Sequence, residues 1–155
     1  MDIIQKLLKR KLDREASVQI HVYGDSMHPI LIEYDKICVA KSDSYCVGDI
    51  LVFQYAQYEL LVHRLLQIKD GRYYCKGDNS FRLEVVQLTN IYGKVMSICR
   101  NGNDVLLPEV NNAFINHSLQ VGNEFERCGN DIKSTELYKR YVNMYISGDE
   151  LVIKS

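Results

Sequence analysis

Six short segments rich in β-branched, aromatic and other apolar residues follow one another between residues 17 and 98. Glycine, aspartate, asparagine and serine separate them, and these residues favour turns. Strands this closely spaced, with no helical pattern between them, predict a compact antiparallel sheet or barrel and exclude alternating βαβ units. The expected strands are residues 17–22, 36–41, 49–55, 60–68, 72–76 and 91–98. The chain is therefore expected to be mainly β.

Helical patterns flank this β-rich body on both sides. Residues 2–14 place apolar side chains at helical spacing with basic residues between them, which predicts a short amphipathic helix. Near 109–127 and 132–147 the same spacing predicts two more helices. The expected organisation is an N-terminal amphipathic helix at 1–14, a β-rich domain at 15–104 and a helical C-terminal extension at 105–155.

The charge balance limits the partners of the chain. Its 155 residues include 19 lysines and arginines and 20 aspartates and glutamates, so that the net charge is −1 at pH 7. We therefore expect no nucleic-acid partner. A membrane-spanning helix needs about 20 consecutive apolar residues, and every apolar run in this chain is much shorter. The first residues lack the pattern of a secretory signal. We expect a cytoplasmic protein, in which residues 2–14 either pack on the body, as we favour, or make a peripheral contact with anionic lipid.

The cysteines indicate neither a disulfide framework nor a metal site. There are five of them, an odd number, and no two are closer than eight residues. A set of paired disulfides needs an even number of cysteines, and a Cys-x-x-Cys metal knuckle needs two cysteines three positions apart. We therefore expect free thiols, no metal and no cofactor.

A serine and a histidine are the candidates for chemistry. Ser26 lies in Gly-Asp-Ser-Met-His-Pro at 24–29, directly after the first expected strand, where a turn can present its hydroxyl. A serine hydroxyl becomes a nucleophile only with a base in hydrogen-bonding reach. His63 is a candidate base because imidazole titrates near neutral pH. The alternation along its strand leaves open which face it occupies.

Four further motifs follow the serine in a fixed order. They are Val-Gly-Asp-Ile-Leu-Val-Phe at 47–53, Leu-Val-His-Arg-Leu at 61–65, Tyr-Cys-Lys-Gly-Asp-Asn at 74–79 and Ile-Tyr-Gly-Lys-Val at 91–95. This order resembles the serine peptidases that join type I signal peptidases and LexA-type self-cleaving repressors. The closest likeness is to the endoplasmic-reticulum-type signal peptidases, which carry histidine where LexA-type proteins and the commoner bacterial signal peptidases carry lysine.

The resemblance implies acyl transfer by a serine and a histidine. Ser26 would attack the peptide carbonyl, and His63 would take its proton and later protonate the leaving amine. A third residue normally orients the imidazole. Asp78, in the Lys-Gly-Asp-Asn motif, and Glu84, a few residues later, are both candidates, and the sequence leaves the choice open.

The residues next to the serine receive further expected roles from the resemblance. The backbone amides of Asp25 and Ser26 are expected to stabilise the oxyanion, while Met27 and His28 are candidates for the substrate groove. One departure concerns a nearby turn, where the chain has Tyr34-Asp35 in place of the usual Gly-Asp. This departure puts the conformation of that turn in doubt.

The function that the resemblance implies is that of a soluble serine endopeptidase that removes a leader or tail from a peptide precursor. Members of this group bind the substrate as an added β-strand, and cleavage after small side chains is expected. Two alternatives stay open: a LexA-type regulator that cleaves its own chain, and a catalytically silent peptidase-like binding module.

Overall fold

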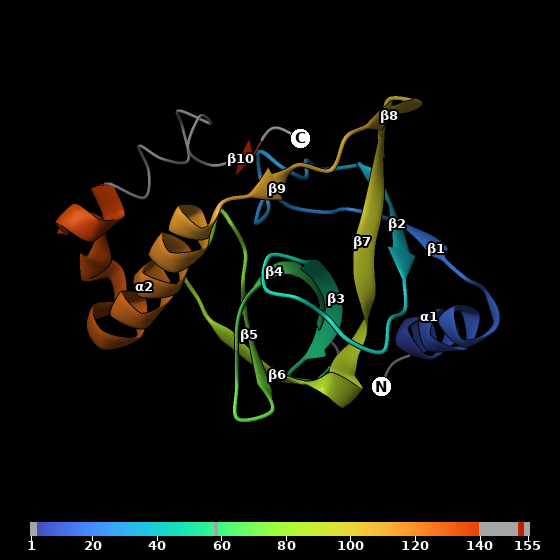
Figure 1. The fold of residues 1–155 in the computed structure, drawn as a ribbon, viewed down its shortest axis with the longest axis horizontal. Helices are drawn as coiled ribbons and strands as arrows, with labels where there is room; N and C mark the ends of the chain where they lie inside the picture. The colour runs from blue at the N-terminus through green and yellow to red at the C-terminus, as the bar shows by residue number, and fades with distance from the viewer. Residues whose placement is uncertain (1–2, 58, 140–151, 154–155) are drawn as a thin grey trace.

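One antiparallel sheet of eight strands forms the body of the molecule (Figure 1). The computed structural model describes residues 3–57, 59–139 and 152–153. The strands follow the order β1-β2-β7-β3-β4-β5-β6, and β8 pairs with β7. Their bounds are β1 Val18–His21, β2 Lys36–Ala40, β3 Ile50–Tyr55, β4 Glu59–Lys69, β5 Arg72–Lys76, β6 Glu84–Gln87, β7 Ile91–Arg100 and β8 Asn103–Val105. The expected mainly β fold is confirmed.

Short turns with left-handed residues set the register of the hairpins. Asp70 and Gly71 have φ angles of +52° and +74°, and Lys69 pairs directly with Arg72 across β4 and β5. Two consecutive residues at positive φ make the turn that suits the right-handed twist of a hairpin. Asp70 and Gly71 therefore form a two-residue turn between the expected strands 60–68 and 72–76.

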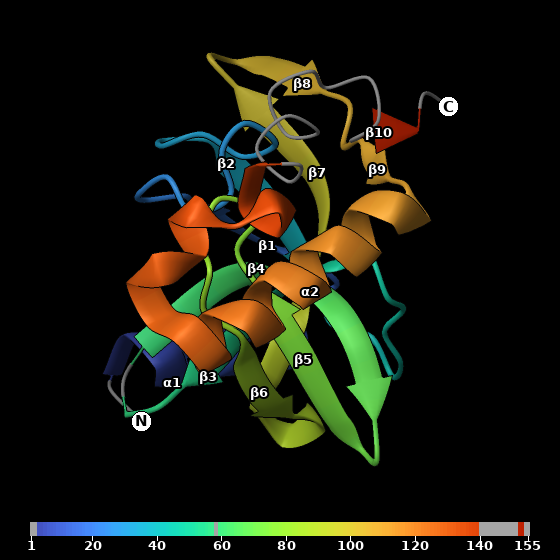
Figure 2. The ribbon, with the colours of Figure 1, turned by 90° about the vertical axis from the view of Figure 1, so that its left-hand side faces the viewer.

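Two helices flank the sheet at different places (Figure 2). Helix α1, Ile3–Arg14, lies near β1, and α2, Asn112–Cys128, crosses β4 and β5. Helix α2 begins at its cap Asn111, whose side chain accepts a hydrogen bond from the Phe114 amide at 2.8 Å. A capping side chain at this position satisfies an amide that has no partner inside the helix.

Short elements complete the chain. They are the 3-10 helices η1 Leu88–Asn90 and η2 Gly129–Ser134 and the paired strands β9 Glu109–Val110 and β10 Val152–Ile153. The helix expected at 132–147 begins later than its pattern suggested, because η2 occupies the chain up to Ser134. Its backbone is helical at 136–139, and the remainder lies outside the described residues.

A single apolar cluster joins both helices to the sheet. Its members are buried side chains from α1, four strands, the segment between β1 and β2, α2 and η2, among them Leu8, Leu12, Val18, Ile37, Val52, Ile98, Phe114, Val121 and Ile132. Helix α2 is thus part of the same core as the strands. None of the described helices is long and apolar enough to span a membrane. A lipid contact of residues 2–14 and a cytoplasmic location stay predictions.

Candidate active site

Ser26 lies in the turn that follows β1. The chain enters this turn through Gly24, whose φ of +81° is the left-handed conformation that glycine adopts without steric cost. The amide of His28 donates to the carbonyl of Asp25 at 3.0 Å, which closes the turn around the serine. The turn presents the Ser26 hydroxyl to the side chain of His63.

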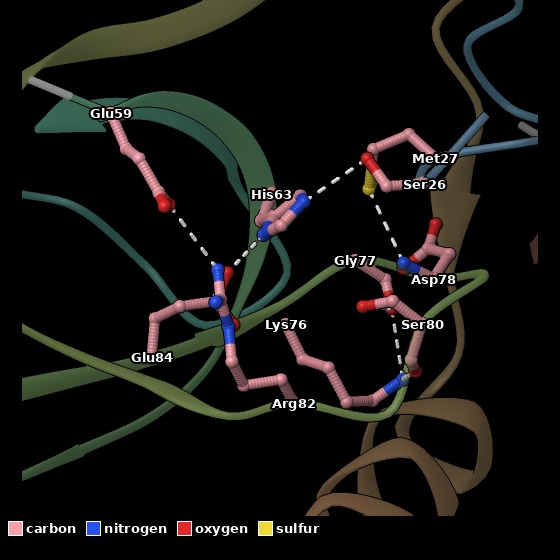
Figure 3. A network of polar contacts seen from close by, with 10 residues as sticks. All are labelled: Ser26, Met27, Glu59, His63, Lys76, Gly77, Asp78, Ser80, Arg82 and Glu84. Atoms are coloured by element: carbon pink, nitrogen blue, oxygen red, sulfur yellow. Dashed lines mark hydrogen bonds and ion pairs between the residues drawn. The ribbon is translucent and has the colours of Figure 1, made fainter. Parts of the chain in front are cut away.

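His63, on β4, links the serine to a carboxylate. Its Nε2 lies 3.1 Å from Ser26 Oγ, and its Nδ1 contacts Oε1 of Glu84 on β6 (Figure 3). The ring of Phe53 packs edge-on against the imidazole, with centroids 6.2 Å apart. In this arrangement Nδ1–H donates to the carboxylate, and Nε2 accepts the hydroxyl proton of the serine.

Glu84 is fully buried beneath the imidazole. It is the first residue of β6 and pairs with Cys75 of β5, so the sheet fixes its position. Among the described residues its second oxygen, Oε2, has no hydrogen-bond partner. A buried carboxylate interacts strongly with the nearest cation, because little water screens it. Glu84 is therefore well placed to stabilise an imidazolium on His63.

Asp78 lies elsewhere and pairs with Arg64. Its Oδ1 accepts from Arg64 Nε at 3.0 Å and its Oδ2 from a terminal guanidinium nitrogen at 2.8 Å. The guanidinium also donates to the Gly48 carbonyl at 2.8 Å. Of the two carboxylates that the sequence left open, the structure brings Glu84 to His63 and gives Asp78 to Arg64. The alternation of β4 explains this, because consecutive residues point to opposite faces.

The loop at 77–80 holds the backbone of the serine turn. The Asn79 amide donates to the Ser26 carbonyl at 2.8 Å, and its side-chain amide donates to the Asp25 carbonyl at 3.1 Å. Gly77 leaves no room for a side chain: a Cβ there would lie 2.6 Å from the Ser26 carbonyl oxygen and 3.1 Å from His63 Nε2. The loop thus fixes the distance between nucleophile and imidazole.

Lys76 supports the 77–80 loop through hydrogen bonds to its carbonyl groups. It is fully buried, and its ammonium nitrogen donates to the carbonyls of Gly77 at 2.9 Å and Ser80 at 2.6 Å. Burial lowers its pKa to about 7, although the carboxylates of Asp78 and Glu84 act in the opposite direction. Sequence reasoning gave this residue no supporting role. The signal was its place directly before Gly77 in the Lys-Gly-Asp-Asn motif.

A cleft of about 490 Å³ opens beside the serine. It is lined by Leu8, Ile20, His21, Val22, Tyr23, Ser26, Met27, Leu60, Leu61, Val62 and His63. Met27 is thus part of the cleft wall, and its sulfur accepts from the Asp78 amide at 3.3 Å. His28 is exposed and does not line the cleft. The expected oxyanion role of the Asp25 and Ser26 amides stays a prediction.

Two unpaired strand edges border this cleft. Strand β1 is the last strand of the sheet and pairs only with β2 within the described chain. On β4, residues 59–63 pair with β3 on one side, whereas β5 pairs only from Arg64 onward. Unpaired edges carry free N–H and C=O groups that can bind an extended chain. The cleft is therefore a place where a peptide strand could be added.

The comparison with known families agrees with this arrangement. A family described as Peptidase S24-like matches residues 3–96, which is more than half of the chain. The match includes the segments that carry Ser26, His63 and Glu84. No curated protein matches the sequence. The chain belongs to the peptidase S24-like family.

Proposed function

We propose that this chain is a serine endopeptidase in which Ser26 is the nucleophile, His63 the general base and Glu84 the residue that orients the imidazole. The observation that carries the proposal is the continuous contact from Ser26 Oγ through both ring nitrogens of His63 to the buried carboxylate. A base within hydrogen-bonding reach, itself held by a third group, is the arrangement that activates a serine for acyl transfer.

The proposed base is a histidine, as in the endoplasmic-reticulum-type signal peptidases. The hydroxyl of Ser26 is hydrogen-bonded to an imidazole, whereas Lys76 and Lys94, the lysines that are the alternative candidates for the base, make other contacts. Lys76 binds loop carbonyls, and Lys94 lies 4.0 Å from Asp49. In the proposed reaction His63 takes the serine proton during attack and donates it to the leaving amine, and a water molecule then releases the acyl-enzyme.

The proposed substrate is a peptide precursor that loses a leader or tail. An extended peptide laid between the free edge of β1 and residues 59–63 of β4 would gain main-chain hydrogen bonds on both sides. Its scissile carbonyl would lie over Ser26, and cleavage would follow a small side chain. The mainly apolar wall of the cleft would take neighbouring side chains.

A fluorophosphonate probe tests the nucleophile. We expect the wild type to be labelled on Ser26, and labelling to be lost in Ser26→Ala and strongly slowed in His63→Ala, because both residues act as one unit. The matched control is Ser97→Ala, which removes an exposed serine on β7 and keeps labelling. Full labelling of Ser26→Ala would place the nucleophile elsewhere.

The same preparation separates the alternatives. Cleavage of added peptides by the wild type supports the proposed endopeptidase. Loss of the intact mass during incubation of the protein alone, absent in Ser26→Ala, would indicate self-cleavage of the LexA type. A folded protein that neither labels nor cleaves would be a silent binding module.

A further inference from the structure

Two exposed tyrosines lie side by side next to the cleft. Tyr23 follows β1 and lines the cleft, and Tyr34 lies in the loop before β2. Their ring centroids are 6.3 Å apart and their planes meet at 87°. The exposed fractions are 74% and 72%. Rings this exposed contribute little to the core, so burial does not account for their position.

The backbone of Tyr34 is strained. Its φ of +73° lies in the left-handed region, which costs a bulky residue free energy that glycine would not incur. The turn that the sequence put in doubt is therefore formed, with tyrosine in the place of glycine. Strain of this kind is concentrated at binding and catalytic sites.

Asp35 holds this turn in place. Its two carboxylate oxygens accept hydrogen bonds from Arg100, both at 2.8 Å, and its Oδ2 also accepts from the Ile32 amide at 2.9 Å. The backbone adds two hydrogen bonds, from the Val22 amide to the Asp35 carbonyl at 2.8 Å and from the Tyr34 amide to the Val22 carbonyl at 2.7 Å. These hydrogen bonds hold the turn in its strained conformation and keep the Tyr34 ring next to Tyr23, which lines the cleft.

The segment that carries the two rings is acidic. The segment 23–35 contains three carboxylates and no lysine or arginine. Asp35 is paired with Arg100, while the exposed Asp25 and Glu33 form no ion pair within the part of the chain that the structure describes. Oε1 of Glu33 lies 3.4 Å from the amide nitrogen of Gly24, the residue after Tyr23. Aromatic faces next to a carboxylate attract a cationic side chain.

We infer that Tyr23, Tyr34 and Glu33 form a recognition site for an arginine or lysine side chain of the peptide substrate, close to the bond that Ser26 cleaves. The inference rests on the proposed peptidase function and adds a substrate class to it. The cleft wall at Tyr23 connects the two sites, so a peptide bound in the cleft would pass the rings.

A synthetic peptide library tests the specificity. Each sub-library varies one position among arginine, lysine, alanine, glutamate and phenylalanine, and mass spectrometry follows cleavage. At one position we expect the wild type to prefer arginine or lysine over glutamate by about tenfold in kcat/KM. Tyr34→Gly and Glu33→Gln should lose most of this preference, and Tyr34→Phe should keep it.

Two controls show that a loss of preference is specific. Glycine suits the left-handed backbone, so Tyr34→Gly should unfold at a temperature no lower than that of the wild type, which excludes misfolding. Leu106→Ala removes an equally exposed side chain, 74% accessible, outside this site and should leave the preference intact. An unchanged preference in Tyr34→Gly would overturn the inference, and so would a wild type that prefers glutamate.

Binding separates the two proposals. Fluorescence anisotropy measures the affinity of the Ser26→Ala protein for a labelled arginine peptide and its glutamate counterpart. If the wild type cleaves nothing while Ser26→Ala binds the arginine peptide through Tyr34, the peptidase proposal fails and the recognition site stands. If the wild type cleaves all peptides alike, the peptidase proposal stands and the recognition site fails.

Discussion

Replacing Gly77 with alanine would test how closely the 77–80 loop sets the position of the nucleophile. The added Cβ would lie 2.6 Å from the Ser26 carbonyl oxygen, and 3.0 Å from the Ser80 hydroxyl. An ordinary carbon–oxygen contact is about 3.3 Å, so the loop and the serine turn would have to separate by about 0.7 Å. The hydrogen bond from the Asn79 amide to the Ser26 carbonyl would lengthen with them.

The expected loss follows from that displacement. A shift approaching 1 Å at a reacting group lowers the rate by up to about 100-fold, and we expect kcat/KM of Gly77→Ala to fall by roughly 10- to 100-fold. Overpacking also destabilises the fold, by about 1–3 kcal/mol. The assay is peptide cleavage together with the rate of fluorophosphonate labelling, at a temperature where thermal unfolding shows the variant folded.

Gly102→Ala is the matched control for this variant. Gly102 has a φ of +78° and no atom within 4 Å of an added Cβ, so alanine there is strained but clashes with nothing. The cost is about 1–2 kcal/mol of stability, at a turn between β7 and β8 that does not line the cleft beside Ser26. If Gly77→Ala cleaved and labelled as fast as Gly102→Ala, the loop would not set the geometry of the site, and the reasoning would be wrong.

Two further predictions concern buried charges. Glu84→Gln should keep the fold and lower kcat/KM by about 10²- to 10⁴-fold. Asp78→Asn should instead lower the free energy of unfolding in urea by about 3–5 kcal/mol, because it leaves Arg64 buried without its partner charge. A large loss of activity in Asp78→Asn and a large loss of stability in Glu84→Gln would show that the two roles are assigned the wrong way round. Lys76 has a folded pKa of about 7 and an ordinary value of 10.5, so the unfolded chain holds a proton that the folded chain releases between these values. The stability of the wild type relative to Lys76→Met should therefore be lowest below pH 7 and rise toward pH 10, by at most about 1.4 kcal/mol per pH unit. If the difference in stability between the two proteins did not change with pH, Lys76 would not lose its proton on folding, and the prediction would be wrong.

The strands could be predicted where turn residues mark their ends. Arg72–Lys76 has the same bounds in sequence and structure, because Asp70-Gly71 fixes one end of it. Strands β6 and β8 were not predicted, since each has only three or four residues and too little alternation to be recognised. The dipeptide Asn101-Gly102 was a usable signal for β8, because Asn-Gly favours two-residue hairpin turns, and in the structure both residues have the positive φ angles of such a turn.

The candidate site could be predicted in part. The motif order identified Ser26 and His63 as partners, and the structure brings their side chains together. The third residue could not be chosen, because Asp78 and Glu84 are six positions apart and both lie near the same strand end. The pairing of β6 with β5, together with the alternation of His63 and Arg64 along β4, determines which carboxylate meets the imidazole.

The buried cluster described above has a consequence for the limits of the folding unit. The family match ends at residue 96, but Phe114, Val121 and Ile132 are completely enclosed and share their cluster with Leu8 and Leu12 of the first helix. A chain cut back to the matched residues would leave a hole where these three side chains lie, and such cavities are costly. The stretch matched by the family is thus shorter than the stretch over which the core is continuous, and thermal unfolding should proceed as a single cooperative transition that includes α1 and α2.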